Sequence, residues 1–269
     1  MMKKGLNQGF ALPKGISHRQ EFEMTKKAGF DGIEFNLTDP FTAEEMEEIK
    51  ALSKEFGIHV LSLVSDLHWQ YHLTSNNPAD RKRSQEIIKE LVTQAKELGA
   101  DSVLVVPGTV NENVTYVEAY NNALNALIEL KPFLEEMKIN VGIENVWNKF
   151  LITAFEMRDF IDAVDCPYVG SYFDAGNVAI NAFPEYWIEI LGKRIKKVHI
   201  KDFRACDSGG VLSTFVDLGE GDIRWNRVMK ALRDIGYDDY ITCEVAYHPL
   251  CPQTSLDNMG RTLDEILAL

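Results

Sequence analysis

Glycine punctuates this chain in a repeated way, and that pattern constrains the fold more than any other feature. Four times a helical pattern ends at a glycine, and an apolar run begins soon afterwards. The four stretches read KAGFDG, KEFGI, KELGAD and RDIGYDD. A glycine just past the last helical turn commonly takes the left-handed conformation that ends a helix. The repeat therefore predicts helices that each lead through a glycine into a β-strand.

Apolar runs and segments of 3.6-residue periodicity alternate along the whole chain. The predicted strands are Leu6–Phe10, Gly32–Leu37, His59–Val64, Ser102–Val106, Asn140–Glu144, Val169–Asp174, Lys197–Lys201 and Tyr240–Val245. The clearest predicted helices are Ala43–Phe56, Pro78–Leu98, Tyr116–Met137 and Asp222–Ile235, with Thr42, Asn77 and Asp222 as caps. Eight strands with intervening helices favour a (β/α)8 TIM barrel over an open sheet. No linker or composition shift divides the chain, so residues 1–269 are expected to form a single domain.

The composition argues against several classes of partner. The net charge of −13 disfavours nucleic acid, whose phosphates would be repelled. The mean hydropathy is −0.17 and no apolar run reaches about 20 residues, so no membrane contact is expected. The N-terminus lacks the sustained apolar region of a signal peptide, which indicates a cytoplasmic location. Reduced thiols are expected there, since no CxxC pair occurs among Cys166, Cys206, Cys243 and Cys251.

Acidic side chains and one histidine stand at the ends of four consecutive predicted strands. Residues along a barrel strand alternate between the lumen and the surrounding helices, so the polar residue of each strand end faces inward. The inward set is Glu144, Asp174, His199 and Glu244. Barrel enzymes carry their sites at this end, and three carboxylates there repel one another unless a cation neutralises them. The set predicts one divalent metal ion, with Mn²⁺ favoured and Mg²⁺, Co²⁺ or Zn²⁺ as alternatives.

Other polar residues have both a functional and an ordinary structural explanation. Lys201 could reach a substrate oxygen or pair with a nearby carboxylate, and Arg204 could contact substrate or a surface acid. Glu34 has lumen parity, which suits either a substrate hydrogen bond or an ion pair inside the barrel. His68 lies in the stretch SDLHWQYHLTS, which is either a substrate-covering loop or a plain surface loop. Substrate contact by these four residues is the working expectation.

Five fragments resemble the xylose isomerase-like superfamily of sugar isomerases and epimerases. They read GFDGIEFNL, GIEN, YFDAGN, VHIKDFR and ITCEV, and the resemblance extends over the whole chain. It implies that Glu144, Asp174, His199 and Glu244 bind one divalent metal ion. Ketohexose 3-epimerases of the tagatose 3-epimerase type carry a histidine where this chain has Asn177. The DAGN form is more similar to ketopentose-phosphate 3-epimerases, which adds Asn177 to the expected substrate-binding residues.

The resemblance implies a metal-dependent reaction on a small sugar or sugar phosphate. The favoured reaction is 3-epimerisation of a ketopentose 5-phosphate, in which Glu144 and Glu244 remove and return a proton through a metal-stabilised enediolate. Aldose–ketose isomerisation, hydroxypyruvate isomerisation and inosose dehydration remain alternatives. An abasic-site endonuclease would need more histidines and a less acidic surface, and a sugar-binding barrel would not need two flanking glutamates. Related barrels are often dimers or tetramers, so a homo-oligomer is expected.

Overall fold

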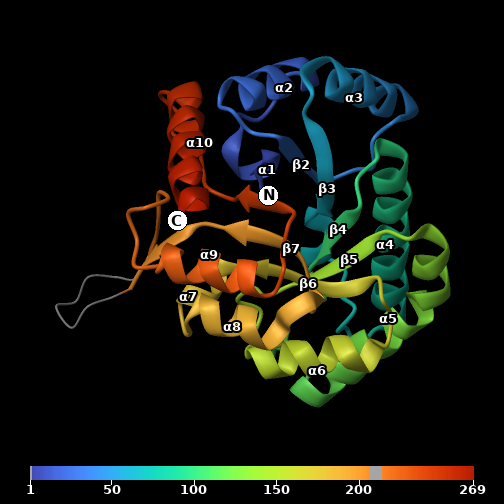
Figure 1. The fold of residues 1–269 in the computed structure, drawn as a ribbon. Helices are drawn as coiled ribbons and strands as arrows, with labels where there is room; N and C mark the ends of the chain where they lie inside the picture. Colours follow the sequence, from blue (N-terminus) through green and yellow to red (C-terminus); the bar gives the residue numbers. More distant parts are fainter. Residues whose placement is uncertain (1, 206–213) are drawn as a thin grey trace.

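Eight parallel strands close into a barrel, and helices surround it (Figure 1). The structure is a computed structural model that describes residues 2–205 and 214–269. The eight strands lie around the barrel in the same order in which they occur along the chain. The barrel closes where β1 (Lys3–Asn7) pairs in parallel with β10 (Tyr240–Cys243). This is the (β/α)8 TIM barrel that the alternation predicts.

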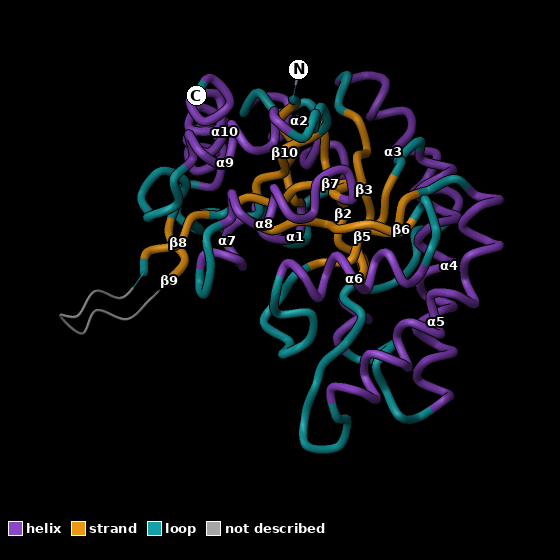
Figure 2. Tube along the Cα trace, turned by 60° about the horizontal axis from the view of Figure 1, so that its bottom comes forward, coloured by secondary structure: helices purple, strands orange, loops and turns teal. Residues whose placement is uncertain are grey.

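The remaining elements follow one another in the expected order. The other barrel strands are β2 (Gly32–Leu37), β3 (His59–Ser65), β4 (Ser102–Val105), β5 (Asn140–Glu144), β6 (Val169–Asp174) and β7 (Ile195–Ile200). The α-helices are α1 (Gln8–Ala11), α2 (His18–Lys27), α3 (Ala43–Phe56), α4 (Pro78–Leu98), α5 (Tyr116–Met137), α6 (Ala154–Val164), α7 (Ala175–Ala179), α8 (Pro184–Leu191), α9 (Trp225–Asp234) and α10 (Pro252–Ala268). The 3₁₀ turns η1 (Asp66–Trp69) and η2 (Gly192–Arg194) precede α4 and β7. An antiparallel pair, β8 (Asp202–Arg204) and β9 (Thr214–Val216), follows β7 and lies beside α7 (Figure 2).

The glycine punctuation has the predicted backbone conformation. The glycine that ends the helical pattern in each stretch has positive φ, namely Gly29 (78°), Gly57 (64°), Gly99 (79°) and Gly236 (78°). Helices α3, α4 and α5 have the predicted bounds. The side chains of Thr42 and Asn77 cap α3 and α4 by accepting backbone amides of the first turn, as expected.

The ends of β3, β4, β7 and β10 differ from the prediction by one or two residues, and two further differences have a visible cause. The strand predicted at Leu6–Phe10 is wrong, because β1 ends at Asn7, whose side chain accepts the Phe10 amide and begins α1. The predicted cap at Asp222 is also wrong. Helix α9 begins at Trp225, and the Asp222 carboxylate accepts the amide of Ala205 instead.

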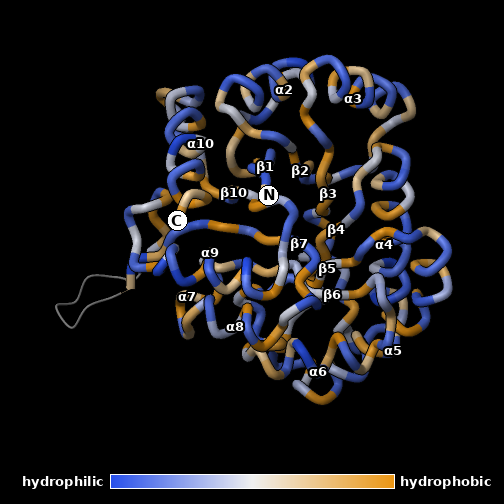
Figure 3. Tube along the Cα trace, in the orientation of Figure 1, coloured by the Kyte–Doolittle hydropathy of each residue, from blue (hydrophilic) through white to orange (hydrophobic). Residues whose placement is uncertain are grey.

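The strands divide their side chains between two apolar layers. Val198 and Ile200 join the main core between the barrel and its helices. Tyr172 packs in the lumen with Leu104 and Val106. Figure 3 shows apolar residues along the barrel strands and mixed polar and apolar residues along the helices around them. This alternation leaves the carboxyl ends of the strands free to carry polar side chains into the lumen.

Gly260 in α10 is a position where alanine is expected to destabilise the barrel. Alanine normally favours a helix over glycine by about 1 kcal/mol. Here a Cβ atom would lie 2.1 Å from the Ala28 carbonyl oxygen, so the helix would have to shift. Gly260→Ala is expected to lower the unfolding free energy by about 1–3 kcal/mol, measured by urea denaturation. Thr254→Ala at an exposed position of α10 is the control and should be nearly neutral. A stabilised Gly260→Ala protein would contradict this packing argument.

Within residues 2–205 and 214–269, none of the helices has the length and apolar character needed to cross a bilayer. Cys166, Cys243 and Cys251 form no disulfide within the described residues. Cys206 lies outside the described residues.

Candidate active site

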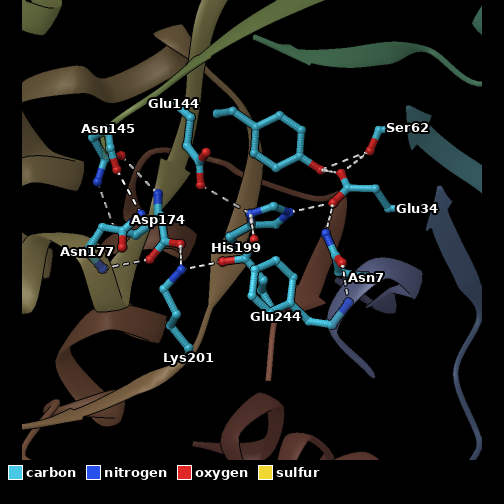
Figure 4. A network of polar contacts seen from close by, with 12 residues as sticks. Asn7, Glu34, Ser62, Glu144, Asn145, Asp174, Asn177, His199, Lys201 and Glu244 are labelled. Atoms are coloured by element: carbon cyan, nitrogen blue, oxygen red, sulfur yellow. Dashed lines mark hydrogen bonds and ion pairs between the residues drawn. The ribbon is translucent and has the colours of Figure 1, made fainter. Parts of the chain in front are cut away.

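The carboxyl ends of β5, β6, β7 and β10 bring together the four side chains of the predicted metal site (Figure 4). Glu144 ends β5, Asp174 ends β6, His199 is the second-last residue of β7, and Glu244 follows β10 directly. Asp174 and His199 are direct neighbours in the β6–β7 pairing. The Glu244 amide donates to the Ile200 carbonyl at 2.9 Å, which continues the alignment of β10 with β7. Strand register therefore sets these side chains next to one another.

The four side chains face one small buried space. One ligand atom from each of Glu144, Asp174, His199 and Glu244 lies within 4.8 Å of the others. His199 Nδ1 is 3.5 Å from Glu144 Oε1 and 3.7 Å from Glu244 Oε1. Among the described residues, this buried nitrogen has no hydrogen-bond partner. The Nδ1 atom of the imidazole thus faces a group of carboxylates.

Glu34 on β2 holds the other nitrogen of the His199 ring. His199 Nε2 lies 2.7 Å from Glu34 Oε1, and Asn7 Nδ2 donates to the same oxygen at 2.6 Å. The hydroxyls of Ser62 and Tyr172 both donate to Glu34 Oε2. An ionised carboxylate only accepts hydrogen bonds, so this contact assigns a proton to Nε2 of the ring. In the neutral tautomer, Nδ1 is then free to bind a cation.

Lys201, one residue past β7, brings a positive charge to the cluster. Its Nζ lies 2.8 Å from Asp174 Oδ2 and forms a second ion pair with Glu244. Asn145 holds the backbone of Asp174 from both sides, since its amide donates to the carbonyl and accepts from the N–H, each at 2.9 Å. Asp174 Oδ1 accepts the Asn177 amide at 2.7 Å. The Asp174 carboxylate is therefore oriented by the protein itself.

Burial and mutual repulsion perturb the charges of this cluster. Burial raises the pKa of Glu144 to about 7, and Glu244 adds to the rise. Burial also raises the pKa of Glu244, although Lys201 and His199 oppose it. Burial would lower the pKa of His199, but Glu34 and Glu244 outweigh it and raise that pKa well above its usual value. The pKa of Glu34 is about 2 despite burial, because His199 stabilises its ionised form. Such a cluster favours the binding of an added cation.

These residues fit a divalent metal ion. Three carboxylates and one imidazole nitrogen form a donor set suited to Mn²⁺, Mg²⁺, Co²⁺ or Zn²⁺. The buried Nδ1 atom that lacks a hydrogen bond is the observation that distinguishes this cluster from a simple ion-pair network. The residues that would hold the ion are Glu144, Asp174, His199 and Glu244.

A cavity of about 280 Å³ opens onto the cluster. The charged or titratable residues of its wall are Asp66, Glu144, His199, Lys201 and Glu244. Its wall also includes the partly exposed aromatic side chains of Phe10, Trp69, Trp147 and Phe215. A mostly apolar cavity with a few convergent polar groups is typical of a small-molecule site. We call it the active-site cavity.

The sequence matches the profile of one family, the xylose isomerase-like TIM barrel, over residues 22–267. The chain belongs to the xylose isomerase-like TIM barrel family. This barrel is 24% identical over 278 residues to the inosose isomerase of Bacillus velezensis, covering 99% of this chain and 98% of that protein. It is 26% identical over 235 residues to a ketose 3-epimerase of Arthrobacter globiformis, covering 84% of this chain and 76% of that protein.

The fold of this xylose isomerase-like barrel also occurs among solved structures. The IOLI protein, solved with a bound zinc atom, superposes with a TM-score of 0.84 at 18% sequence identity. The superposition covers 99% of this chain and 98% of that chain. At this identity the likeness concerns the fold alone.

Two of the five expected substrate-binding residues, Lys201 and Asn177, line the active-site cavity of the xylose isomerase-like barrel. The other three lie elsewhere. Glu34 is 0% exposed, and its carboxylate is already hydrogen-bonded to four side chains of the barrel. His68 is also 0% exposed, and burial lowers its pKa to about 4. Arg204 is exposed and donates to a backbone carbonyl at 2.5 Å. Their positions in the structure do not support substrate contact by these three.

Sequence reasoning missed the residues that support the cluster in this xylose isomerase-like barrel. Asn145, Asn7 and Ser62 orient Asp174 or Glu34 but carry no motif of their own. A signal existed for Asn145, since it directly follows Glu144 in the GIEN fragment. Asn7 and Ser62 are the register partners of Glu34 on the adjacent strands β1 and β3, so strand pairing brings them to it.

Proposed function

We propose that this chain is a divalent-metal-dependent ketose 3-epimerase. The observation that carries the proposal is the pair of glutamates at the cavity, Glu144 and Glu244. They project from β5 and β10, which are separated in the barrel by β6 and β7, and both carboxylates approach His199 Nδ1. A substrate carbon held between them would have one carboxylate on each face, which inversion at that carbon requires.

The two glutamates would then act in turn. One carboxylate removes the proton from C3, and the electrons of that C–H bond move through C2 onto the carbonyl oxygen. The other glutamate, protonated at the start, gives its proton to the opposite face of C3, and the carbonyl re-forms. General acid–base catalysis of this kind contributes about 10²–10⁴-fold in rate. In the reverse reaction the two side chains exchange roles.

The remaining polar residues would bind and orient the substrate. A divalent cation, for which we favour Mn²⁺, would polarise the substrate carbonyl and make the neighbouring C–H more acidic. Lys201 lines the cavity and could donate a hydrogen bond to a substrate oxygen, while Asp174 and His199 would hold the ion. The aromatic side chains at the cavity would help to exclude water from the reacting carbon.

For the substrate we favour a ketopentose 5-phosphate. The support is the DAGN fragment, in which Asn177 replaces the histidine of the tagatose-type enzymes, and Asn177 lines the cavity. Similarity to an inosose isomerase and a ketose 3-epimerase supports the broader class, a polyhydroxylated ketone. Aldose–ketose isomerisation, hydroxypyruvate isomerisation and dehydration of an inosose are the alternatives within this chemistry.

The decisive experiment is NMR in D₂O with Mn²⁺ and a panel of ketoses and ketose phosphates. Deuterium at C3 together with the C3 epimer is the expected result. Exchange at C1 or C2 with an aldose product would identify an isomerase, and loss of water without an epimer would identify a lyase. Absence of exchange and of product on the whole panel would refute the proposed function. Protein treated with a chelator is the control and should be inactive until Mn²⁺ is restored.

A further inference from the structure

A second cavity of about 350 Å³ adjoins the active-site cavity, and we call it the Lys149 cavity. The two cavities share Val146, Trp147 and Asn177 in their walls. The Lys149 cavity lies between the loop that follows β5 (residues 145–152) and the segment from α7 to α8. Among the described residues that line it, Lys149 is the only charged side chain. In a chain of net charge −13, a cavity wall with one cation and no acid favours an anion.

Two polar side chains of the Lys149 cavity, those of Lys149 and Asn181, are available to a ligand. Lys149 forms no hydrogen bond or ion pair through its side chain with residues 2–205 or 214–269. The side-chain amide of Asn181, in the same wall, likewise has no partner within these ranges. An ammonium and an amide N–H₂ are donors that suit the oxygens of a phosphate group.

The loop that carries Lys149 is held in a strained conformation. Lys149 has a φ of 60° and Leu151 a φ of 53°, in the left-handed region that side chains other than glycine rarely adopt. Between them, Phe150 is 1% exposed and packs edge-on against Phe160 at 5.7 Å. The Asn148 side chain accepts the Phe150 amide and donates to a backbone carbonyl at 2.6 Å. Strain persists only where the surroundings enforce it, and such positions cluster at functional sites.

Lys138 shows that the same conformation can have an ordinary cause. Its φ is 59°, but it is the C-cap of α5, where a left-handed residue ends the helix. No helix ends at Lys149, because β5 stops at Glu144 and α6 begins at Ala154. The conformation of Lys149 therefore lacks this explanation and instead fixes the lysine backbone at the cavity wall.

We propose that the Lys149 cavity binds the phosphate group of a sugar phosphate whose reacting carbons occupy the active-site cavity. This inference rests on the proposed function and deepens it. Asp66, Glu144 and Glu244 line the active-site cavity and would repel a phosphate there. The two cavities adjoin at Trp147 and Asn177, so the far end of the sugar would extend past these residues to the neighbouring cavity, where Lys149 is the only charged residue of the described wall.

The test compares one ketopentose 5-phosphate with the same ketopentose lacking phosphate. Lys149→Met is expected to raise KM for the phosphate ester by about tenfold or more, because a charge-assisted hydrogen bond is lost. The kcat, and KM for the free ketopentose, should stay unchanged, and Lys149→Arg should retain most of the affinity. Lys138→Met, an exposed lysine in the same backbone conformation, is the matched control and should change nothing.

Calorimetric titration with inorganic phosphate separates this inference from the proposed function, because it needs no turnover. Wild-type protein and Lys149→Arg should bind phosphate, and Lys149→Met should lose the binding. If no ketose is turned over, the proposed function fails while this titration still decides the phosphate site. Unchanged phosphate binding in Lys149→Met overturns the inference. Equal KM values of the wild-type enzyme for the ester and the free sugar overturn it as well, because the bound phosphate is then not the substrate's.

Discussion

Replacing Glu244 by glutamine is expected to lower kcat by about 10²–10⁴-fold, the usual contribution of a general acid–base group. Glu144→Gln should lower kcat by a factor of the same order. The physical reason is that each carboxylate serves one face of the substrate carbon, and a neutral amide can neither take nor return a proton. Rates are measured at saturating Mn²⁺, with the metal content of each variant determined in parallel.

The two variants should also differ in a way that a general loss of structure cannot produce. With one glutamate left, the proton of a single epimer can still exchange with D₂O and return to the same face. Glu244→Gln and Glu144→Gln should therefore exchange opposite epimers, and neither should invert the carbon. Glu185→Gln is the control, because Glu185 is also buried but pairs with Arg224 on the outer helical layer. Exchange of the same epimer by both variants would contradict the assignment of one face to each glutamate.

Glu34→Gln is expected to weaken metal binding by about 10–100-fold, the usual effect of losing the partner of a metal-binding histidine. Glu34 is the acceptor for His199 Nε2, at 2.7 Å. A glutamine can turn its NH₂ group toward the ring, which would favour the proton on Nδ1 and block the nitrogen that faces the acids. Glu34 does not line the active-site cavity in the described structure, so its effect should come through His199.

Calorimetric titration of the metal-free protein with Mn²⁺ measures this effect without reference to activity. Glu185→Gln again serves as the control for the loss of a buried carboxylate, and it should leave the metal affinity unchanged. At saturating Mn²⁺ the Glu34→Gln enzyme should recover much of its kcat, because Glu144 and Glu244, the proposed acid and base, are intact. An unchanged dissociation constant for Mn²⁺ would show that Glu34 does not position His199 for the metal.

The sequence predicts the fold well because its main signal is local. Glycines past helix ends, the 3.6-residue period of helices and the alternation along strands all depend on residues close in the sequence. These signals predict the barrel and the bounds of α3, α4 and α5. Alternation along the strands also predicts that Glu144, Asp174 and His199 face the lumen. The failures involve contacts from elsewhere in the chain, such as Asp222, whose carboxylate binds the amide of Ala205 rather than capping α9.

Depth within the barrel is the property that the sequence could not provide. Strand parity predicts that Glu34 faces inward, but its height along the axis depends on how far each strand is staggered against the next. That stagger brings Asn7 from β1 and Ser62 from β3 to the same level and encloses Glu34. His68 presents the same difficulty, since only the packing of η1 buries its ring completely.

The ion pairs of Lys201 with Asp174 and Glu244 bear on how the enzyme matures in a cell. Small zinc domains remain unfolded until their ion arrives. This chain already carries an internal counter-charge, Lys201, for two of its buried acids. Under the proposed function, synthesis and metal loading can then be separate events, and scarcity of the ion would leave a folded, inactive pool ready for rapid activation rather than a population marked for degradation.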